Sequence, residues 1–508
     1  MIKQIIIDNF DGGIEDDPRI QSTNGYACSS HFDVSQPHRL IPLKDMEAEA
    51  DIIGAAIHNY DITDFLYHKY SSGSNLFALG INYNTNSNPA IFEKADSGAP
   101  VTSAFTLSTN SASATGTAVA NSFFEYQQNL YFIRNSNVLV KYARASTTLT
   151  ATFATFSSST APTGKPFHHK KSDIVYFPFG NVLSQMSGAA VTDPLTLPNT
   201  ESITALAEWG TYLAIATSPA GGATTSCKLY IYDMVSADVA DVVTLGEGVV
   251  KWMENINGTI MIGISSMNGA LNAATEIDNI KIYSYMGGQN VTLVKNLITK
   301  RGVIHELYQF ASRKNEILYF ATKTLNINGT SRTQIWTLHK NRFGKWIVEG
   351  NALPKNDTTV SLIRGFAVIG DYLWISFDET NTHEVRRTND AGSGLATAFT
   401  ASSLYESQIF NVGDSSTTKK LLGVTVMTEP LPTAGQTVLQ YRKDEETSWT
   451  DIFTHTTDNS ISHSAINIES TGATLPEFKE IQFRIKSTGG AVITGLKFKV
   501  EILDKDLY

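Results

Sequence analysis

Short apolar runs, rich in β-branched and aromatic residues, recur along the chain in pairs with polar turn residues between the two members. The clearest pairs are Leu213–Thr217 with Lys228–Tyr232, and Ile260–Ile264 with Ile280–Tyr285. Runs of this length and composition are typical of β-strands joined by hairpin connections. The pattern therefore predicts a chain built mainly from antiparallel strand pairs. Helical periodicity is scarce, and Leu43–Ala50 is the best short helix candidate.

The strand pairs recur at a regular spacing. Seven candidate pairs have first strands that begin at residues 76, 130, 174, 213, 260, 317 and 373, so that consecutive units begin between 39 and 57 residues apart. A four-stranded propeller blade needs about 40 to 50 residues. A further strand precedes some pairs, as at Ile203–Gly210 and Val249–Met253. The sequence thus predicts an all-β fold with a six- or seven-bladed β-propeller, and a string of hairpins in two or three sandwiches is the alternative that spacing leaves open.

The pattern divides the chain into three regions: an N-terminal arm over residues 1–50, the propeller over 51–400, and a second domain over 401–508. Propellers commonly close their ring with one terminal strand that completes the last blade. Ile5–Ile7 is predicted as that closing strand. The tracts Thr102–Ala120 and Ser146–Pro166 are rich in Ser, Thr and Ala with few charges, and are predicted as long inter-strand loops or an extended β-arm with assembly contacts.

The hydrophobic pattern changes after residue 400. Apolar and polar residues alternate there along several short segments, which is typical of strands with one buried and one solvated face. The residues predicted to be buried are Leu422, Val424, Val426, Thr437, Leu439, Tyr441, Ile481, Phe483, Ile485, Leu496, Phe498, Val500 and Ile502. About a hundred residues with several such strands predict a small C-terminal β-sandwich.

Composition narrows the range of functions. Of the 508 residues, 42% are hydrophobic and 17% are charged, against a usual charged fraction of about 25%, so disorder is disfavoured. Thirty-nine basic and 49 acidic side chains give a net charge of −10, which disfavours a reader of duplex DNA. Cys28 and Cys227 belong to no Cys/His cluster, so we expect no disulfide framework and no structural zinc, and two reduced, buried thiols.

The first ten residues hold one Lys and a short apolar run that ends at Asp8. This run is shorter than the roughly 7- to 15-residue core of a secretory signal peptide. No stretch reaches the roughly 18 apolar residues of a transmembrane helix. We therefore expect synthesis in a cytoplasm and no membrane insertion.

Catalytic patterns are weak. Propellers that cleave glycosides need two carboxyl groups facing one pocket, and Glu254, Asp278 and Asp371 are candidates near strand ends. Acidic residues in turns more often cap or solvate the backbone. The chain has no Ser-x-Asp-x-Gly-x-Thr-Trp box, no phosphate-binding Gly-rich loop and no Gly-x-Ser-x-Gly elbow. We expect no enzyme activity, no catalytic residues and no cofactor.

Three features could bind ligands, and each has a simpler explanation. The acidic cluster Asp8–Asp17 offers oxygen ligands for calcium, but a solvated turn also explains it. His168 and His169, followed by two Lys, could form a metal or anion patch, and a wet loop is the favoured interpretation. Six tryptophans could line a sugar-stacking groove, with core packing favoured: Trp209, Trp252, Trp336, Trp346, Trp374 and Trp449. We expect no metal-binding residues.

Several short motifs resemble those of tailed-bacteriophage virion proteins. The start, Asp8–Ile14, with Cys28–Val34 and Arg39–Leu43, resembles the opening of such proteins: a Phe-x-Gly-Gly-like turn, an aromatic-Asp stretch and a Leu-x-Pro segment. The segments Trp336–Trp346 and Val438–Arg442, together with Lys419-Lys-Leu-Leu-Gly, resemble tail proteins of the propeller type. These include the tail nozzle or tail tubular proteins of short-tailed phages.

The resemblance implies a structural virion component of the tail, in which a symmetric ring of copies forms a conduit for genome ejection. It implies homo-oligomer contacts, other tail or connector proteins as partners, DNA only as passing cargo, and transient contact with the host envelope. No catalytic residues belong to this family pattern. The acidic balance is compatible, since like charge weakens attachment to phosphates. The alternatives are a receptor- or glycan-binding tail protein and, less favoured, a polysaccharide-degrading propeller enzyme.

Overall fold

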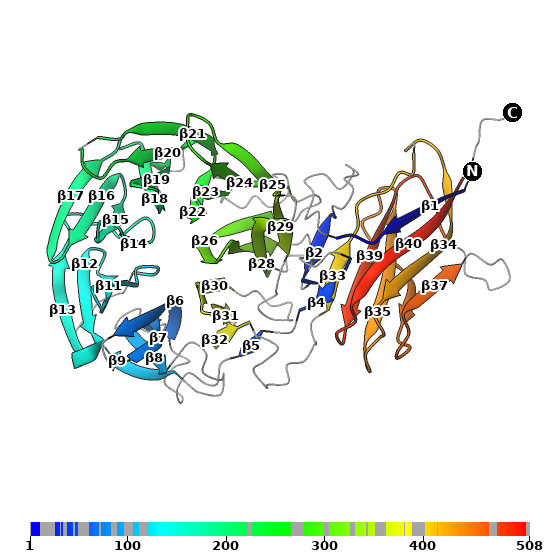
Figure 1. Cartoon of the computed structure of the whole chain (residues 1–508), viewed down its shortest axis with the longest axis horizontal. Coiled ribbons are helices and arrows are strands. Elements are labelled where there is room, and N and C mark those ends of the chain that lie inside the picture. The colour runs from blue at the N-terminus through cyan, green and yellow to red at the C-terminus, as the bar shows by residue number, and fades with distance from the viewer. Residues whose placement is uncertain are drawn as a thin grey trace. The chain divides into compact units, whose positions relative to one another are not determined.

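The computed structural model of this chain is almost entirely β-structure (Figure 1). It describes residues 2–10, 26–30, 32–33, 38–43, 46–48, 60–70, 73–82, 89–95, 105–110, 119–220, 226–236, 238–265, 279–298, 304–325, 331–341, 344–350, 362–379, 382–388, 402–413, 415–466 and 475–503. The single helical element in these ranges is the 3₁₀ turn η2 (Arg144–Ser146). Within them, no helix is long and apolar enough to cross a membrane.

Seven four-stranded antiparallel sheets form the propeller, which confirms the predicted fold class. The first four sheets are β6 (Tyr60–Tyr70), β7 (Gly73–Asn82), β8 (Ala90–Ala95), β9 (Thr106–Asn110); β10 (Phe124–Tyr126), β11 (Asn129–Arg134), β12 (Val138–Ala143), β13 (Thr148–Thr155); β14 (Phe167–His169), β15 (Ile174–Phe179), β16 (Val182–Ser187), β17 (Ala190–Thr196); and β18 (Glu201–Trp209), β19 (Tyr212–Pro219), β20 (Ser226–Tyr232), β21 (Asp241–Glu247).

The remaining three sheets follow the same order, except that the last one takes its outer strand from the N-terminal region. They are β22 (Val249–Ile256), β23 (Thr259–Ser265), β24 (Asn279–Tyr285), β25 (Thr292–Ile298); β26 (Ile304–Lys314), β27 (Ile317–Leu325), β28 (Ser331–Lys340), β29 (Trp346–Gly350); and β30 (Leu362–Ile369), β31 (Tyr372–Glu379), β32 (Thr382–Arg387), β5 (Glu47–Ala48).

The first strand of each sheet is the innermost strand of a closed ring. Each innermost strand contacts the innermost strand of the next sheet, and β30 of the seventh sheet contacts β6 of the first. The chain divides into two compact units, and the unit formed by residues 47–333 and 358–394 contains the first five sheets, the seventh sheet, and β26 and β27 of the sixth. Residues 1–46, 334–357 and 395–508 form the other unit.

The predicted closing strand is wrong. Ile5–Ile7 belongs to β1 (Ile2–Ile7), which pairs with β40 (Ile493–Ile502) in the sandwich. The ring is closed instead by β5, whose Ala48 pairs with Arg386 of β32. Ile5 and Ile7 pack against the apolar core of the sandwich, which explains why the most apolar segment of the arm is drawn there. The predicted helix over 43–50 is also wrong, because β5 lies in it.

The polar tracts predicted as loops each contain the outermost strand of a sheet, β9 in the first tract and β13 in the second. An outermost strand packs on one side only, so Ser and Thr suffice on its solvated face. Side chains of β13 alternate between exposed and half-buried, as this explanation requires.

The sandwich consists of two five-stranded sheets. The first sheet has the order β1, β40, β34 (Lys419–Thr428), β37 (Ser462–Ile466), and β38 (Glu477–Phe478) also pairs with β34. The second sheet has the order β2 (Cys28–Ser30), β33 (Ser403–Glu406), β39 (Ile481–Thr488), β35 (Gln436–Lys443), β36 (Thr450–His455). The two-stranded sheet β3 (Phe32–Asp33) and β4 (Ile41–Pro42) belongs to the same unit. The sandwich is thus built from both ends of the chain.

The sandwich core follows the predicted alternation at most positions, whereas Leu422, Tyr441 and Ile502, which were predicted to be buried, are half-buried. Phe483 and Phe498 are fully buried with their ring centroids 4.8 Å apart. Leu421, and not Leu422, occupies the buried position on β34, because the register shifts between Leu421 and Gly423. Such a bulge moves the following side chains to the other face of the strand.

Candidate functional site

A pocket of about 290 Å³ lies among the innermost strands of the ring. Strands β18, β22, β26 and β30 contribute to it, together with the segments that precede β10 and β14. Its polar and charged lining residues are Asn121, Thr163, Lys165, Thr204, Lys251, Glu254, Gln309 and Ser312. Every lining residue belongs to the ring unit, so this pocket is formed by the propeller alone.

Two acidic side chains in this region have pKa values shifted toward neutrality. Burial raises the pKa of Glu254 to about 7, although Arg313 and Lys165 oppose the shift. Burial also raises the pKa of Asp64, on β6, to about 6, against the lowering effect of Lys165 and of the backbone N–H groups of Phe123 and Asn121. The Asp64 carboxyl is 3% exposed, and its Oδ1 lies 3.7 Å from Lys165 Nζ.

These acids could exchange protons near neutral pH, since a carboxyl group titrates where its shifted pKa lies. The lysine acts electrostatically on both of them, so they form one charge cluster. Among the acids proposed from the sequence, Glu254 is the one placed in the pocket. Asp371 lies at the β30–β31 turn, where its Oδ1 is 2.9 Å from Lys314 Nζ, and Asp278 is outside the described residues. Sequence reasoning missed Asp64, whose only signal is a charge inside an apolar strand.

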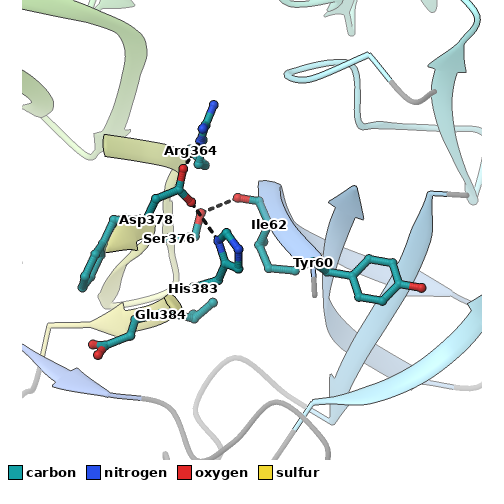
Figure 2. A pocket seen from close by; sticks show the side chains of 9 residues that line it. Tyr60, Ile62, Arg364, Ser376, Asp378, His383 and Glu384 are labelled. Carbon is teal, nitrogen blue, oxygen red and sulfur yellow. Dashed lines mark hydrogen bonds and ion pairs between the residues drawn. The ribbon is translucent and has the colours of Figure 1, made fainter. Parts of the chain in front are cut away.

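A second polar cluster lies where the seventh sheet meets the first (Figure 2). His383 on β32 faces Asp378 on β31, and the two are cross-strand partners. His383 Nδ1 lies 2.9 Å from Asp378 Oδ1 and 2.6 Å from Oδ1 of Asp61 on β6. Arg364 on β30 donates from Nε to the other oxygen of Asp378 at 2.5 Å. Four strands therefore contribute one side chain each.

The charges of this cluster balance. Hydrogen bonding to Asp378 and Asp61 raises the pKa of His383 to about 9, so the imidazole is cationic at neutral pH. Burial opposes ionisation of Asp378, yet His383 and Arg364 hold its pKa below the ordinary value. Two carboxylates thus face two cations, which lowers the cost of placing charge at the junction.

The backbones of the seventh and first sheets approach closely beside this cluster. Ser376 Oγ on β31 donates a hydrogen bond to the carbonyl oxygen of Ile62 on β6 (Figure 2). A Cβ atom on Gly365 would lie 2.8 Å from Ser376 Oγ and 3.0 Å from the Ile62 oxygen, so glycine is required there. Tyr60 and Glu384 are among the residues that line the adjoining cavity, whose volume is about 10 Å³.

The histidine pair and the acidic cluster predicted from the sequence do not form a common binding site among the described residues. His168 and His169 lie on strand β14 and point to opposite sides, and the interpretation as a wet loop is wrong because His169 is 1% exposed and bonded to Ser172. His168 Nε2 pairs with Asp173 at 3.1 Å. The acidic residues after Phe10 lie outside the described residues.

Core packing is confirmed for Trp252, Trp336 and Trp374, which are at most 4% exposed. Trp252 lies against Gly263, where an added Cβ would come within 2.3 Å of the indole. Trp209, Trp346 and Trp449 are half-buried.

The two cysteines differ in what the structure describes. Cys227 is a free, fully buried thiol, as expected, and burial raises its pKa to about 11. The side chain of Cys28 lies outside the described residues.

Comparisons with known proteins are limited to the fold. No family model matches the chain, and no curated protein matches it by sequence. Similar solved structures include hydrazine synthase from Kuenenia stuttgartiensis, at 10% identity, a TM-score of 0.44, and coverage of 66% of this chain and 99% of that one. The N-terminal domain of Nup159 matches at 9% identity and a TM-score of 0.42, and the match covers 74% of this chain and 100% of that one. BamB from Moraxella catarrhalis matches at 12% identity and a TM-score of 0.37, and the match covers 72% of this chain and 99% of that one.

Proposed function

We propose that this chain is a non-enzymatic structural component of a bacteriophage tail, nozzle- or adaptor-like, that assembles into a symmetric ring of copies and forms a conduit for genome ejection. The motif resemblance at the N-terminus and in the C-terminal domain suggests the class. The fold is compatible, because a closed propeller is a stiff scaffold that presents loops at fixed positions. No step of this role needs a catalytic group.

The observation that carries the proposal is a set of exposed apolar residues in the connections of two neighbouring sheets of the ring. Val235, in the β20–β21 connection, is 90% exposed, and Met286, in the β24–β25 connection, is 74% exposed. These are equivalent connections of the fourth and fifth sheets, so they lie on the same face of the ring. Tyr212, at the β18–β19 turn of the fourth sheet, is 37% exposed. Large exposed apolar side chains on one face are a feature that contact surfaces between proteins use.

The path of the chain between the sandwich and the ring supports a structural role. The N-terminal segment supplies β1 and β2 to the sandwich and then β5 to the ring, and the chain returns to the sandwich at β33 after β32. The sandwich sheets and the sheets of the ring are therefore joined by two covalent connections, one from β4 to β5 and one from β32 to β33. A component that contains DNA under pressure benefits from such a double connection, and a net charge of −10 weakens retention of the passing phosphates.

Interface variants test the proposal. Replacement of Val235 and Met286 by Asp should convert an oligomer into monomers, because two carboxylates would be desolvated in the contact. Thr150→Asp, on the exposed face of β13, is the matched control and should leave the assembly intact. Sedimentation velocity gives the measurement. A wild-type chain that sediments as a monomer at all concentrations would contradict the proposal.

The central pocket favours a second candidate, a glycan-binding or polysaccharide-degrading tail protein. The observation is the pair Glu254 and Asp64, whose raised pKa values are those expected of proton donors near neutrality. Binding on a glycan array that is lost in Glu254→Gln, or sugar release abolished by the same change, would support this candidate. Unchanged binding and no release of sugar would leave the structural role as the better account.

A further inference from the structure

We propose that Asp61, Asp378 and His383 form a binding site for a divalent transition-metal cation that fastens the seventh sheet of the ring to the first. The three ligand atoms are Asp61 Oδ1, Asp378 Oδ1 and His383 Nδ1, all within 4.8 Å of one another. Two of the three residues come from β31 and β32, and the third comes from β6. A shared cation would therefore act across the closure of the ring.

Two of the three spacings between the ligand atoms are close to those on one face of an octahedron, and the third is within 4.8 Å. Metal bonds of roughly 2.1 Å at right angles separate neighbouring ligands by about 3.0 Å. The imidazole nitrogen lies 2.6 Å and 2.9 Å from the two carboxylate oxygens. Small side-chain rotations would bring the three atoms onto a common ion.

The Asp61 carboxylate faces the same imidazole nitrogen as Asp378. Its Oδ1 is buried and lies 2.6 Å from His383 Nδ1, whose ring hydrogen bond is directed at Asp378. A cation bound between the three atoms would replace the proton that His383 Nδ1 carries, so binding should release that proton.

Arg364 orients the Asp378 carboxylate without being a ligand itself. It holds Oδ2 of Asp378 at 2.5 Å and leaves Oδ1 directed at His383. Outer partners of this kind orient metal ligands and commonly change affinity 10- to 100-fold. The guanidinium also offsets one carboxylate charge, and the adjoining cavity of about 10 Å³ leaves room for about one water molecule beside an ion.

The ligand set selects the class of ion. One imidazole nitrogen with two carboxylate oxygens suits Zn²⁺ or Mn²⁺. Ca²⁺ and Mg²⁺ prefer oxygen ligands throughout, so they should bind more weakly. The role of the ion would be structural, because all three ligands come from strands at the closure.

Calorimetry on the full chain after treatment with a chelator tests the site, with Zn²⁺ and Mn²⁺ as probes. We expect one saturable site per chain and at least a tenfold loss of affinity in Asp61→Asn and in His383→Gln. His168→Gln is the matched control, because His168 also pairs with one Asp. The metal affinity of this variant should equal that of the wild type. Equal affinity in all four proteins, or no saturable site, would overturn the proposal.

A spectroscopic measurement on the unmodified chain covers the case in which a variant does not fold. Pulsed electron paramagnetic resonance of bound Mn²⁺ should show coupling to one imidazole ¹⁴N. A spectrum of bound Mn²⁺ without ¹⁴N coupling would contradict the proposed ligand set. Thermal unfolding should shift upward with Zn²⁺ in the wild type and in His168→Gln, and an equal shift in His383→Gln would contradict the site.

Discussion

Two junctions between neighbouring sheets of the ring are held together differently. The fourth and fifth sheets follow each other directly, since β21 ends at Glu247 and β22 begins at Val249. Their shared core is apolar, with Ala214, Ile260 and Ile262 among its buried residues. The seventh and first sheets meet across 314 residues of sequence at the Ser376–Ile62 hydrogen bond.

This difference follows from chain connectivity. Contacts between adjacent segments cost little chain entropy, whereas closing a long loop costs more before any contact forms. Apolar packing is non-directional and does not by itself fix which strands pair. The closing junction therefore combines an apolar core around Trp374 with a directional cluster of Asp61, Asp378, His383 and Arg364. The interface that joins the two ends of the ring thus carries directional polar contacts beside its apolar core.

Removal of the large side chain at the closure should have the largest effect. Trp374 is fully buried and contacts Phe65 and Phe105, at centroid distances of 6.1 Å and 5.9 Å. Trp374→Ala should cost about 3–5 kcal/mol in the free energy of unfolding. Urea denaturation measures it. Hydrogen exchange should rise first in β6 and β32, and a uniform rise over all seven sheets would contradict a special role for the closure.

Two buried acids should give opposite pH dependences. The pKa of Asp64 is raised from 3.8 to about 6, so its stabilising contribution is present below pH 3.8 and is lost as the pH rises through 6. The stability of Asp64→Asn relative to the wild type should therefore increase between pH 4 and 8, by about 2–3 kcal/mol. Unfolding at several pH values measures this difference.

Glu201, in the fourth sheet, is the comparison for Asp64. Burial opposes its ionisation, but hydrogen bonds from Lys228, at 2.5 Å, and from Thr217 and Tyr230 hold its pKa below the ordinary value. Its contribution is present above its ordinary pKa and is lost as the pH falls through the folded value. Glu201→Gln should thus lose stability most at neutral pH, and a slope of the same sign as that of Asp64→Asn would refute this assignment.

Two serines allow a matched test of a single hydrogen bond at each junction. Ser376 Oγ donates to the Ile62 oxygen at the closure, and Ser218 Oγ accepts from Val250 N–H at 2.9 Å between the fourth and fifth sheets. Each change to Ala should cost about 0.5–1.5 kcal/mol. Only Ser376→Ala should increase hydrogen exchange at the ring closure, and the same local increase in Ser218→Ala would remove the distinction.

The smallest effect is expected from Cys227, at the junction of the fourth and fifth sheets. Its fully buried thiol donates to the Gly248 oxygen at 3.0 Å, and burial raises its pKa to about 11. In a Cys28→Ser background a disulfide reagent should label this thiol only as fast as the protein opens. Rapid labelling of the native protein would show that this junction is not closed.

Much of the propeller could be predicted because its central strands are buried on both faces. The seven predicted pairs correspond to the second and third strands of the seven sheets, as with Leu213–Thr217 on β19 and Lys228–Tyr232 on β20. Outermost strands such as β13 were not predicted, because their solvated faces carry Ser and Thr. The strand that closes the ring was not predicted either, because two residues, Glu47 and Ala48, give no periodic signal.

Neither candidate site could be assembled from the sequence. Asp61 and Asp378 are separated by more than 300 residues, and only the closure of the ring places both beside His383. Glu254 could be named in advance because it lies near the end of an apolar strand. Lys165, which lines the same pocket, comes from the segment before β14, and Asp64, beside Lys165, comes from β6. Contacts of this kind depend on the order of sheets around the ring, which hydrophobic periodicity does not encode.

The central claim is that copies of this chain form a symmetric ring in a phage tail. Electron cryo-microscopy of particles of the phage that encodes the chain tests it most directly, together with mass spectrometry of the same particles. The account predicts the chain among the virion proteins and density for several seven-bladed propellers related by rotation about the tail axis. Particles that infect normally and contain no copy of the chain would contradict it.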